Sequence, residues 1–545
     1  MTLLSKFLRA NLLLVHVVFA DASPGSSLIN WQPCSEFNST EPTQCANLTV
    51  PLDYTEIDSN KTLQLQLLRI PALHQPSKGS ILFNFGGPGL AGRPSLASLS
   101  DIIRNSTSKY HDLVAFDPRG TGNTLPFSCF EDENERRSYF LQTPKAASFS
   151  WAKSSDTTLA RMWATAKLLA DKCYERNRES GRLIGSAFAA RDIMKIVDAL
   201  GEDGLLRYWG TRFVWNAPGQ TAAVMFPERI DRMVLDGNVN PHEYYQSYDE
   251  EQWTDSDKTF NAVFQSCVAD PSVCRLAQRY PNRTAAQLEE TIYTLIDDLN
   301  DRPIPFNGTL VDYGFVKTGV TIALYSSLLW PILDVGFDAL IARDLHSFTQ
   351  AWEELVAAYT SAGASPDAVI GIQCGDKMVR VETLDAFLPI AERQFGISRI
   401  LGDGQTAMGM VCAQWRLPAK GQYTGDFRSK TRHPILFIGN TADPITPLAS
   451  AQNASAGFEG SVVLQANGYG HSSVGTSACA NLAVETYYVN GTLPEAGTLC
   501  ELDQPLSLGS VSGDVKGRDG LLPRWWAAIV VVTWLVWLMI DDLSC

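Results

Sequence analysis

Short apolar runs alternate with helical patterns between residues 65 and 235, and this alternation constrains the fold more than any other feature. The segments 80–85 (SILFNF) and 113–117 (LVAFD) are mainly apolar, and each ends at a turn rich in glycine or proline. Such runs are typical of strands buried on both faces of a parallel sheet. A helical face follows at residues 193, 196, 197 and 200, before further strands at 205–209 and 232–235. This order predicts an α/β core.

The alternation of apolar strands with helices ends at about residue 241, and helical periodicity alone continues to residue 402. Thr284 and Gln287 form a predicted capping box, and an apolar helical face follows at residues 288, 292, 295, 296 and 299. Strand patterns return at 434–438 and 462–464 and persist to about residue 502. We therefore expect one α/β domain in two parts, 23–240 and 403–505, interrupted by a helical cap at 241–402.

Cysteines and glycosylation sequons indicate an oxidising compartment. The chain has eleven cysteines, which is many for a reducing compartment. The N-terminus agrees with secretion, because Lys6 and Arg9 precede an apolar run at 11–20. This run ends in the small-x-small site Ala20-Asp21-Ala22. We expect a signal peptide at 1–22 and a secreted glycoprotein; a buried first helix is the alternative. The N-x-Ser/Thr sequons lie at Asn38, Asn47, Asn60, Asn105, Asn282, Asn307, Asn453 and Asn490.

Ten of the cysteines fall into pairs of neighbours along the chain. Pairing that favours short loops would give five disulfides and leave Cys545 over, although other connectivities remain open on sequence alone. The expected bridges are Cys34–Cys45, Cys129–Cys173, Cys267–Cys274, Cys374–Cys412 and Cys479–Cys500.

The net charge and the absence of ligand motifs exclude several classes of function. With 44 basic and 59 acidic residues the chain carries a formal charge of −15, so it lacks the positive field that gathers phosphate backbones. We expect no nucleic-acid partner. The sequence has no zinc-ligand spacing, phosphate-binding loop or dinucleotide fingerprint, so we expect no metal and no cofactor.

The C-terminal tail, 506–545, contains an uncharged apolar run at 525–540. This run is shorter than the roughly 20 residues that a membrane-spanning helix needs. Three interpretations compete: a short transmembrane anchor, a lipid-anchor signal with small residues near 510–513, and an amphipathic segment or an error in the gene prediction. Membrane attachment through 525–540 is therefore a hypothesis.

Three segments after predicted strands carry the candidate chemistry. Gly86, Gly87 and Gly89 follow a buried strand at once, where backbone N–H groups of a glycine loop can face a developing oxyanion; an ordinary tight turn is the alternative. Asp117-Pro118-Arg119 closes the next strand, and we expect a structural role for it. Asp443 and His471 each follow a late strand, in the order in which a hydrolase supplies the orienting carboxylate and the general base. A turn-forming Asp443 is the alternative.

These motifs together resemble a known family. The chain is similar to the secreted tripeptidyl-aminopeptidase-like branch of the proline-iminopeptidase family of serine hydrolases over about residues 31–502. The resemblance implies an α/β hydrolase fold with a helical cap and a Ser-His-Asp triad that removes peptides from a free N-terminus. It would make His471 the base, Asp443 its orienter and the glycine loop part of the oxyanion hole. The motifs are Gly86-Gly87-Pro88-Gly89, Asp117-Pro118-Arg119-Gly120, Tyr208-Trp209-Gly210, Met233-Val234-Leu235-Asp236-Gly237, Asp443-Pro444 and Gly470-His471.

The resemblance fails at the nucleophile. The family pattern places a G-x-S-x-G elbow after residues 208–210, yet here Arg212 stands where the serine is expected and Val214 replaces a small residue. Pro218 stands where the following helix should run. Suitable codons for 212–217 (AGG TTC GTA TGG AAC GCC), read one nucleotide later, encode Gly-Ser-Tyr-Gly-Thr. A local frame error is therefore one hypothesis, and real loss of the nucleophile is the other.

The acidic stretch Asp249-Glu250-Glu251 is a weaker candidate, for binding a substrate amine, and a solvated helix face explains it better. The resemblance thus implies a secreted serine exopeptidase that forms an acyl-enzyme on a peptide substrate. A non-catalytic binding protein on the same fold and an esterase or lipase are the alternatives.

Overall fold

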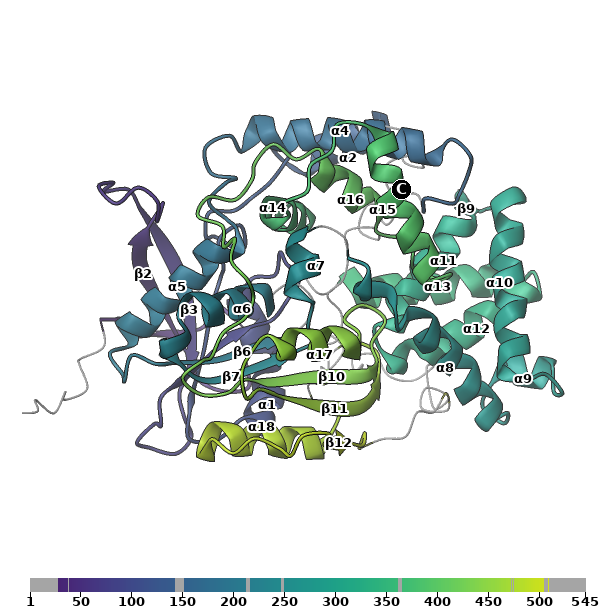
Figure 1. The fold of residues 1–545 in the computed structure, drawn as a ribbon. Coiled ribbons are helices and arrows are strands. Elements are labelled where there is room, and N and C mark those ends of the chain that lie inside the picture. The colour runs from purple at the N-terminus through teal and green to yellow at the C-terminus, as the bar shows by residue number, and fades with distance from the viewer. Residues whose placement is uncertain are drawn as a thin grey trace, which may run out of the picture.

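A large twisted sheet forms the centre of the protein (Figure 1). The computed structural model describes residues 28–37, 39–142, 151–211, 216–246, 249–360, 365–471, 473, 475–503 and 508. Within them the sheet has ten strands in the order β1-β2-β3-β5-β4-β6-β7-β10-β11-β12. The strands from β5 to β12 in this order are parallel, while β1, β2 and β3 are antiparallel to their neighbours. The predicted, mostly parallel α/β sheet is confirmed.

The strands of the sheet are β1 (Gln32–Cys34), β2 (Thr43–Pro51), β3 (Thr62–Ile70), β4 (Ser80–Asn84), β5 (Asp112–Phe116), β6 (Leu206–Thr211), β7 (Ile230–Asp236), β10 (Leu436–Ala442), β11 (Val462–Tyr469) and β12 (Leu499–Cys500). Every residue of β4, β5 and β6 is buried, as their apolar composition predicts for central strands covered on both faces.

Helices cover both faces of the sheet (Figure 1). On one face lie α1 (Gly92–Ser106) and α18 (Ala478–Asn490), whose apolar side chains share a buried cluster with β4 and β5. On the other face lie α5 (Ser186–Leu200), α6 (Asn216–Met225) and α17 (Leu448–Ala456). The predicted apolar face of α5 is buried there, and the helix ends at Gly201 in the left-handed conformation.

Between β7 and β10 the chain leaves the sheet and forms helices (Figure 1). The first group shares one buried apolar cluster. Its members are α8 (Ser256–Ala269), α9 (Arg275–Arg279), α10 (Ala285–Asp301), α11 (Tyr313–Leu324), α12 (Trp330–Ile341) and α13 (Leu345–Thr360). The capping box of Thr284 and Gln287 is present at the start of α10. A short hairpin, β8 (Ile304–Phe306) with β9 (Thr309–Val311), lies where only helices were expected.

A second helical layer joins segments from both sides of the β6–β7 unit. It contains α2 (Glu133–Gln142), α4 (Thr158–Arg176), α14 (Pro366–Asp376), α15 (Leu384–Ile397) and α16 (Thr406–Ala413). Apolar side chains of α4, α14 and α16 form one buried cluster, so residues before β6 contribute to the helical part of the protein. The short elements α7 (Pro241–Gln246), η1 (Pro227–Arg229), η2 (Glu251–Trp253) and η3 (Ser327–Leu329) complete the described fold.

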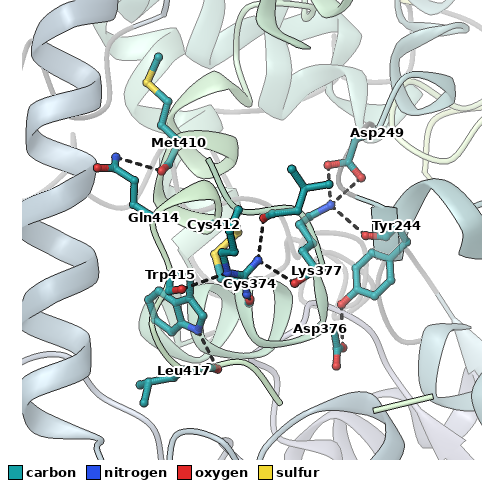
Figure 2. Close-up of a disulfide and its surroundings, with 12 residues drawn as sticks. Tyr244, Asp249, Cys374, Asp376, Lys377, Met410, Cys412, Gln414, Trp415 and Leu417 are labelled. Atoms are coloured by element: carbon teal, nitrogen blue, oxygen red, sulfur yellow. Dashed lines mark hydrogen bonds and ion pairs between the residues drawn. A yellow bond between two sulfur atoms is a disulfide. The ribbon is translucent and has the colours of Figure 1, made fainter. Parts of the chain in front are cut away.

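The structure contains the five disulfides expected from the sequence. They are Cys34–Cys45, Cys129–Cys173, Cys267–Cys274, Cys374–Cys412 and Cys479–Cys500. Figure 2 shows the bridge between α14 and α16. Cys545 lies outside the described residues.

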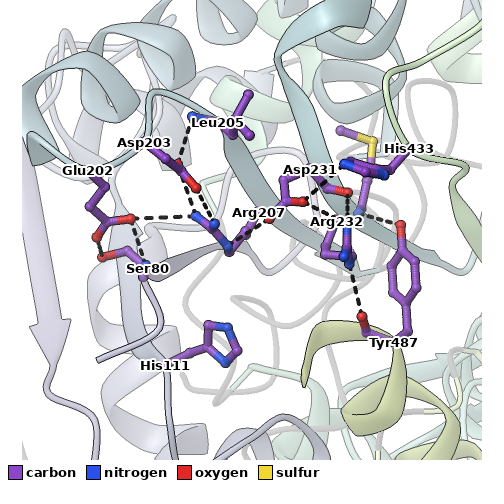
Figure 3. Close-up of polar contacts among 12 residues, drawn as sticks. Ser80, His111, Glu202, Asp203, Leu205, Arg207, Asp231, Arg232, His433 and Tyr487 are labelled. Carbon is purple, nitrogen blue, oxygen red and sulfur yellow. Dashed lines mark hydrogen bonds and ion pairs between the residues drawn. The ribbon is translucent and has the colours of Figure 1, made fainter. Parts of the chain in front are cut away.

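A network of ion pairs lies where β6 and β7 begin, at the end of the sheet away from the predicted site (Figure 3). Arg207 contacts Glu202 at 3.7 Å and Asp231 at 2.9 Å, and it also pairs with Asp203. Asp231 in turn contacts Arg232 at 2.6 Å. The alternation of charges neutralises the buried Arg207 and links the starts of the two strands, which is a structural role.

Several predictions fall partly or wholly outside the described residues. The asparagines of seven sequons are exposed, whereas Asn38, the segment 1–22 and the apolar run 525–540 lie outside them. Among the helices of the described part, none is long and apolar enough to cross a membrane.

Candidate active site

Several parallel strands of the sheet end side by side at one edge. Residue pairing places Asn84, at the end of β4, beside Gly210 in β6. Thr211, the last residue of β6, pairs with Asp236 at the end of β7, and Asp236 pairs with Ile438 in β10. The glycine loop follows β4, Asp443 follows β10 and His471 follows β11, while residues 212–215, after β6, lie outside the described residues. Open α/β sheets bind ligands at this edge.

The structure brings Asp443 and His471 together. The imidazole Nδ1 lies 3.1 Å from Oδ2 and 3.3 Å from Oδ1 of the carboxylate. Both side chains are 1% exposed, so little water competes for the contact. A carboxylate at Nδ1 selects the tautomer that carries its proton there and leaves Nε2 as the basic nitrogen.

Thr446, which no sequence motif had marked as a candidate site residue, completes the contacts of the carboxylate. Its hydroxyl donates to Oδ2 of Asp443 at 2.6 Å, while the backbone N–H groups of Thr446 and Ile445 donate to Oδ1 at 2.8 and 2.9 Å. These donors stabilise the charged carboxylate and fix its rotamer. An aspartate followed by a threonine three residues later in a turn is the signal that could have indicated this contact.

The loop that carries His471 is fixed to the ends of two strands. Asp236, at the end of β7, accepts hydrogen bonds from the backbone N–H of Ser473 at 3.1 and 3.2 Å and from its hydroxyl at 2.9 Å. Asn440 of β10 donates to the carbonyl of Gly470 at 2.8 Å. The motif that contains Asp236 therefore positions the histidine loop.

The glycine loop has the backbone that its sequence predicts. Gly86, Gly87 and Gly89 have φ values of 93°, 116° and 99°, a region that residues with a Cβ atom rarely adopt. A Cβ atom at Gly89 would lie 2.6 Å from the carbonyl oxygen of Ser365, which precedes α14. The loop thus needs glycine both for its conformation and for its close contact with α14.

The strand-to-helix unit expected around the nucleophile is retained. β6 ends at Thr211 and α6 begins at Asn216, while Arg212 and Val214 lie outside the described residues. Pro218, which stands where the family pattern places this helix, does not interrupt it. Pro218 occupies the first turn of α6, where the missing N–H and the fixed φ of proline are tolerated.

Two glycines allow α6 to lie close to the strands. A Cβ atom at Gly219 would lie 2.6 Å from Tyr208 and 3.0 Å from Leu235. One at Gly210 would lie 2.5 Å from Oδ1 of Asn216. Asn216 also donates to the carbonyls of Asp236 and Gly237 at 3.1 and 2.8 Å, which attaches the start of α6 to the end of β7.

The turn after β5 has the structural role that was expected. Asp117 accepts hydrogen bonds from the backbone N–H and Nε of Arg93 at 3.0 and 2.9 Å. Arg119 is fully buried and pairs with the equally buried Asp192 of α5 at 2.6 Å. These side chains hold the turn against α1 and α5.

The carboxylates of the acidic stretch 249–251 are engaged by the protein itself. Figure 2 shows Asp249 beside Lys377, with Nζ 2.6 and 2.8 Å from the carboxylate oxygens. Glu250 pairs with Arg393 at 2.5 Å, and Glu251 accepts from Asn240 and Ser450, each at 2.9 Å. The stretch is therefore partly buried and bonded to neighbouring segments, which differs from the solvated helix face that the sequence favoured.

Two groups of possible metal ligands occur among the described residues, Cys34 with Glu36 and Cys45, and Cys267 with Cys274 and Asp334. In each group the two cysteines form a disulfide, so neither sulfur is a thiolate that could bind a metal ion.

The strand order, with a mostly parallel central sheet and helices on both faces, defines the class of fold: the chain has the α/β hydrolase fold. Residues 398–500 match the family described as TAP-like protein. The matches to known proteins confirm the resemblance to tripeptidyl aminopeptidases and related serine hydrolases.

Three curated relatives are each 26% identical to this chain. The tripeptidyl aminopeptidase of Streptomyces lividans aligns over 494 residues, which are 87% of this chain and 86% of the relative. The serine protease Hip1 of Mycobacterium tuberculosis aligns over 497 residues, 87% of this chain and 91% of the relative. A carboxylesterase B of the same organism aligns over 512 residues, 88% and 92%.

Proposed function

We propose that this protein is a secreted serine hydrolase of the aminopeptidase type, which cleaves peptides from a free N-terminus through an acyl-enzyme. The observation that carries the proposal is the buried pair of Asp443 and His471, 3.1 Å apart at the end of the parallel strands. The similarity to a tripeptidyl aminopeptidase and a serine protease supports a peptide substrate.

In this mechanism His471 accepts the proton of a serine hydroxyl at Nε2 while the serine oxygen attacks the scissile carbonyl. Asp443 accepts a hydrogen bond from the N–H at Nδ1 and stabilises the imidazolium that forms. Backbone N–H groups near Gly86 and Gly87 stabilise the oxyanion. The imidazolium then protonates the leaving amine, and a water molecule activated by His471 hydrolyses the acyl-enzyme.

The serine itself is missing from the sequence, and we propose that a reading-frame error at Arg212 removed it. The intact ends of β6 and α6 and the close packing at Gly219 support this view, because the surroundings of an elbow are retained. Sequencing the transcript across codons 208–220 tests it. An uninterrupted frame with an arginine codon at 212 would refute it.

Two other functions have specific support. Arg212 as written favours a non-catalytic binding protein, since an arginine cannot act as the nucleophile. The carboxylesterase B relative favours an esterase, because the same triad hydrolyses esters and peptides.

The variant Arg212→Ser/Val214→Gly, which restores the G-x-S-x-G pattern, separates the three functions. We expect it to release amino-terminal fragments from peptides with a free N-terminus, and to spare the same peptides when the N-terminus is blocked. Faster turnover of short-chain esters would identify an esterase. No turnover of either substrate would defeat the enzyme proposal. Adding His471→Gln to the restored form is the matched control, and it should abolish turnover.

We also propose that the chain is secreted and glycosylated after removal of residues 1–22, with domain parts 23–240 and 403–505 around a cap at 241–402. Five disulfides and the exposed asparagines of seven sequons support an oxidising secretory route. Treatment of the expressed protein with an endoglycosidase should lower its mass. An unchanged mass would contradict glycosylation.

Membrane attachment through 525–540 is tested by expressing the full chain beside one that ends at residue 505. If the tail anchors the protein, the full chain should be found with membranes and the shortened chain in the medium. Recovery of both chains in the medium would contradict an anchor.

A further inference from the structure

Helices of the cap contact the loop that carries the candidate base. The backbone N–H of His471 donates to the carbonyl of Tyr325 at 2.8 Å. Ser326 and Gly470 form an antiparallel bridge beside this hydrogen bond. Tyr325 lies between α11 and η3, so the cap is bonded to the backbone of the histidine itself.

The histidine loop is held between the cap and the sheet. On the side of the sheet, the N–H of Gly470 donates to the carbonyl of Ala442 at 3.0 Å. On the side of the cap, a Cβ atom at Gly470 would lie 2.7 Å from the carbonyl oxygen of Tyr325. The φ of Gly470 is 112°, so only glycine allows both this conformation and this approach.

Aromatic side chains add to the contact between the cap and the histidine loop. The ring of Tyr325 meets the imidazole of His471 edge-on, with centroids 5.3 Å apart and planes at 80°. The ring of Trp330 meets Tyr469 in the same way at 6.0 Å and 72°. Such edge-to-face contacts favour one orientation of each ring.

The loop of the candidate orienting carboxylate is also bound to the cap. Ser256, the first residue of α8, donates from its buried hydroxyl to the carbonyl of Pro444 at 2.7 Å. Ile445 is 1% exposed and belongs to the apolar cluster of the cap. The residues that flank Asp443 thus pack with the cap as well as with the sheet.

We propose that the cap is part of the acid–base centre, with Tyr325 and Ser256 as positioning residues, so that Asp443 and His471 are correctly paired only while the cap is docked. The proposal rests on the proposed function where it treats the pair as catalytic. A cap that moved away from this side would remove hydrogen bonds from both loops at once. The cap therefore helps to orient the imidazole of His471, besides any part it has in covering a bound substrate.

Amide hydrogen exchange on the protein as it stands tests this coupling without any turnover. Gly470→Ala inserts a methyl group between the histidine loop and the cap. Gly475→Ala is the matched control, because Gly475 also has a positive φ (76°) in the same loop but faces Ile102 of α1. We expect amides of peptides that cover 469–473 to exchange about tenfold faster in Gly470→Ala and to be unchanged in Gly475→Ala.

A second readout is the Nδ1 proton of His471, observed after ¹⁵N-labelling of the seven histidines. We expect its hydrogen-bonded resonance in the unaltered protein and in Gly475→Ala, and its loss in Gly470→Ala. Unchanged exchange in peptides that cover β4 and β5 would show that Gly470→Ala is folded. If that variant does not fold, Ser256→Ala takes its place, with faster exchange expected at 444–447.

Equal exchange in the two glycine variants, or a retained Nδ1 resonance in Gly470→Ala, would overturn the proposal. These outcomes are independent of the proposed activity. If the elbow-restored form has no turnover while Gly470→Ala still loosens the loop, the hydrolase function fails and the coupling remains.

Discussion

Thr446 Oγ1 lies 3.0 Å from Nδ1 of His471, as close as the carboxylate that is expected to orient the ring. The single hydrogen of this hydroxyl is directed to Asp443 at 2.6 Å, so an oxygen lone pair faces the imidazole. The N–H at Nδ1 of His471 thus has two acceptors, the carboxylate of Asp443 and the hydroxyl of Thr446. The hydroxyl is itself oriented by its hydrogen bond to Asp443. One turn after β10 supplies both acceptors.

Thr446→Val should weaken this arrangement without changing the size of the side chain. In the elbow-restored form we expect about a tenfold lower kcat and a nearly unchanged KM, because the ring loses an acceptor that fixes its orientation. Thr446→Ser keeps the hydroxyl and should recover most of the rate. Steady-state kinetics of the elbow-restored form and its two Thr446 variants tests this prediction. Equal kcat values in the valine and serine variants would refute the role of the hydroxyl.

Asp376 should make the stability of the protein depend on pH. This buried residue accepts a hydrogen bond from Tyr244, as Figure 2 shows, and another from Ser186. Burial raises the pKa of its carboxyl to about 6 from 3.8. The folded state binds the proton of Asp376 more tightly than the unfolded state does. The free energy of unfolding should therefore increase as the pH falls from about 6 to about 4. The share of Asp376 is at most about 3 kcal/mol.

Asp376→Asn should remove this dependence. Urea unfolding at pH 4.5 and pH 7 measures the difference for each form, and the asparagine form should show the smaller difference. Asp58→Asn, in an exposed loop, serves as the control and should behave as the unaltered protein. An identical pH dependence in all three forms would show that Asp376 does not titrate in this range.

Gly219→Ala should destabilise the protein although alanine favours helices. The added methyl would lie 2.6 Å from Tyr208, and overpacking of this kind costs about 1–3 kcal/mol. Gly396→Ala is the matched control, because Gly396 also lies in a helix but has no atom within 4 Å of the added methyl. There we expect a gain of about 0.5–1 kcal/mol. Thermal unfolding compares the two, and a stabilised Gly219→Ala would show that α6 is not held close to β6.

Asp192→Asn should cost about 3–5 kcal/mol, because it leaves the fully buried charge of Arg119 without its counter-ion. The double variant Arg119→Met/Asp192→Leu removes both charges and should lose less than the single variant. Glu459→Gln, which breaks an exposed pair with Lys430, should leave the denaturation midpoint unchanged. A mild effect of Asp192→Asn would contradict the structural role given to this turn.

Local patterns explain why much of the fold could be predicted. The buried strands β4 and β5, the capping box at Thr284 and the short-range disulfides all depend on neighbours in sequence. The proximity of Asp443 and His471 followed from two successive parallel strands whose ends share one edge. By contrast, no local signal connects Tyr325 with His471, since the contact depends on how the cap docks. The packing of α4 against α16 is equally non-local.

The positions of the disulfides have a consequence for how the protein is assembled. Every bridge joins cysteines at most 44 residues apart, and none of the five connects the helices α8–α13 to the sheet. Each unit can therefore be oxidised by itself, before the units meet. The contacts that bring Tyr325 to His471 and Ser256 to Pro444 are all non-covalent. A chain in which all five disulfides have formed correctly can thus still lack the hydrogen-bonded pair of Asp443 and His471. A disulfide-forming enzyme acts only on cysteine thiols, so it would not distinguish such a chain from one with a docked cap.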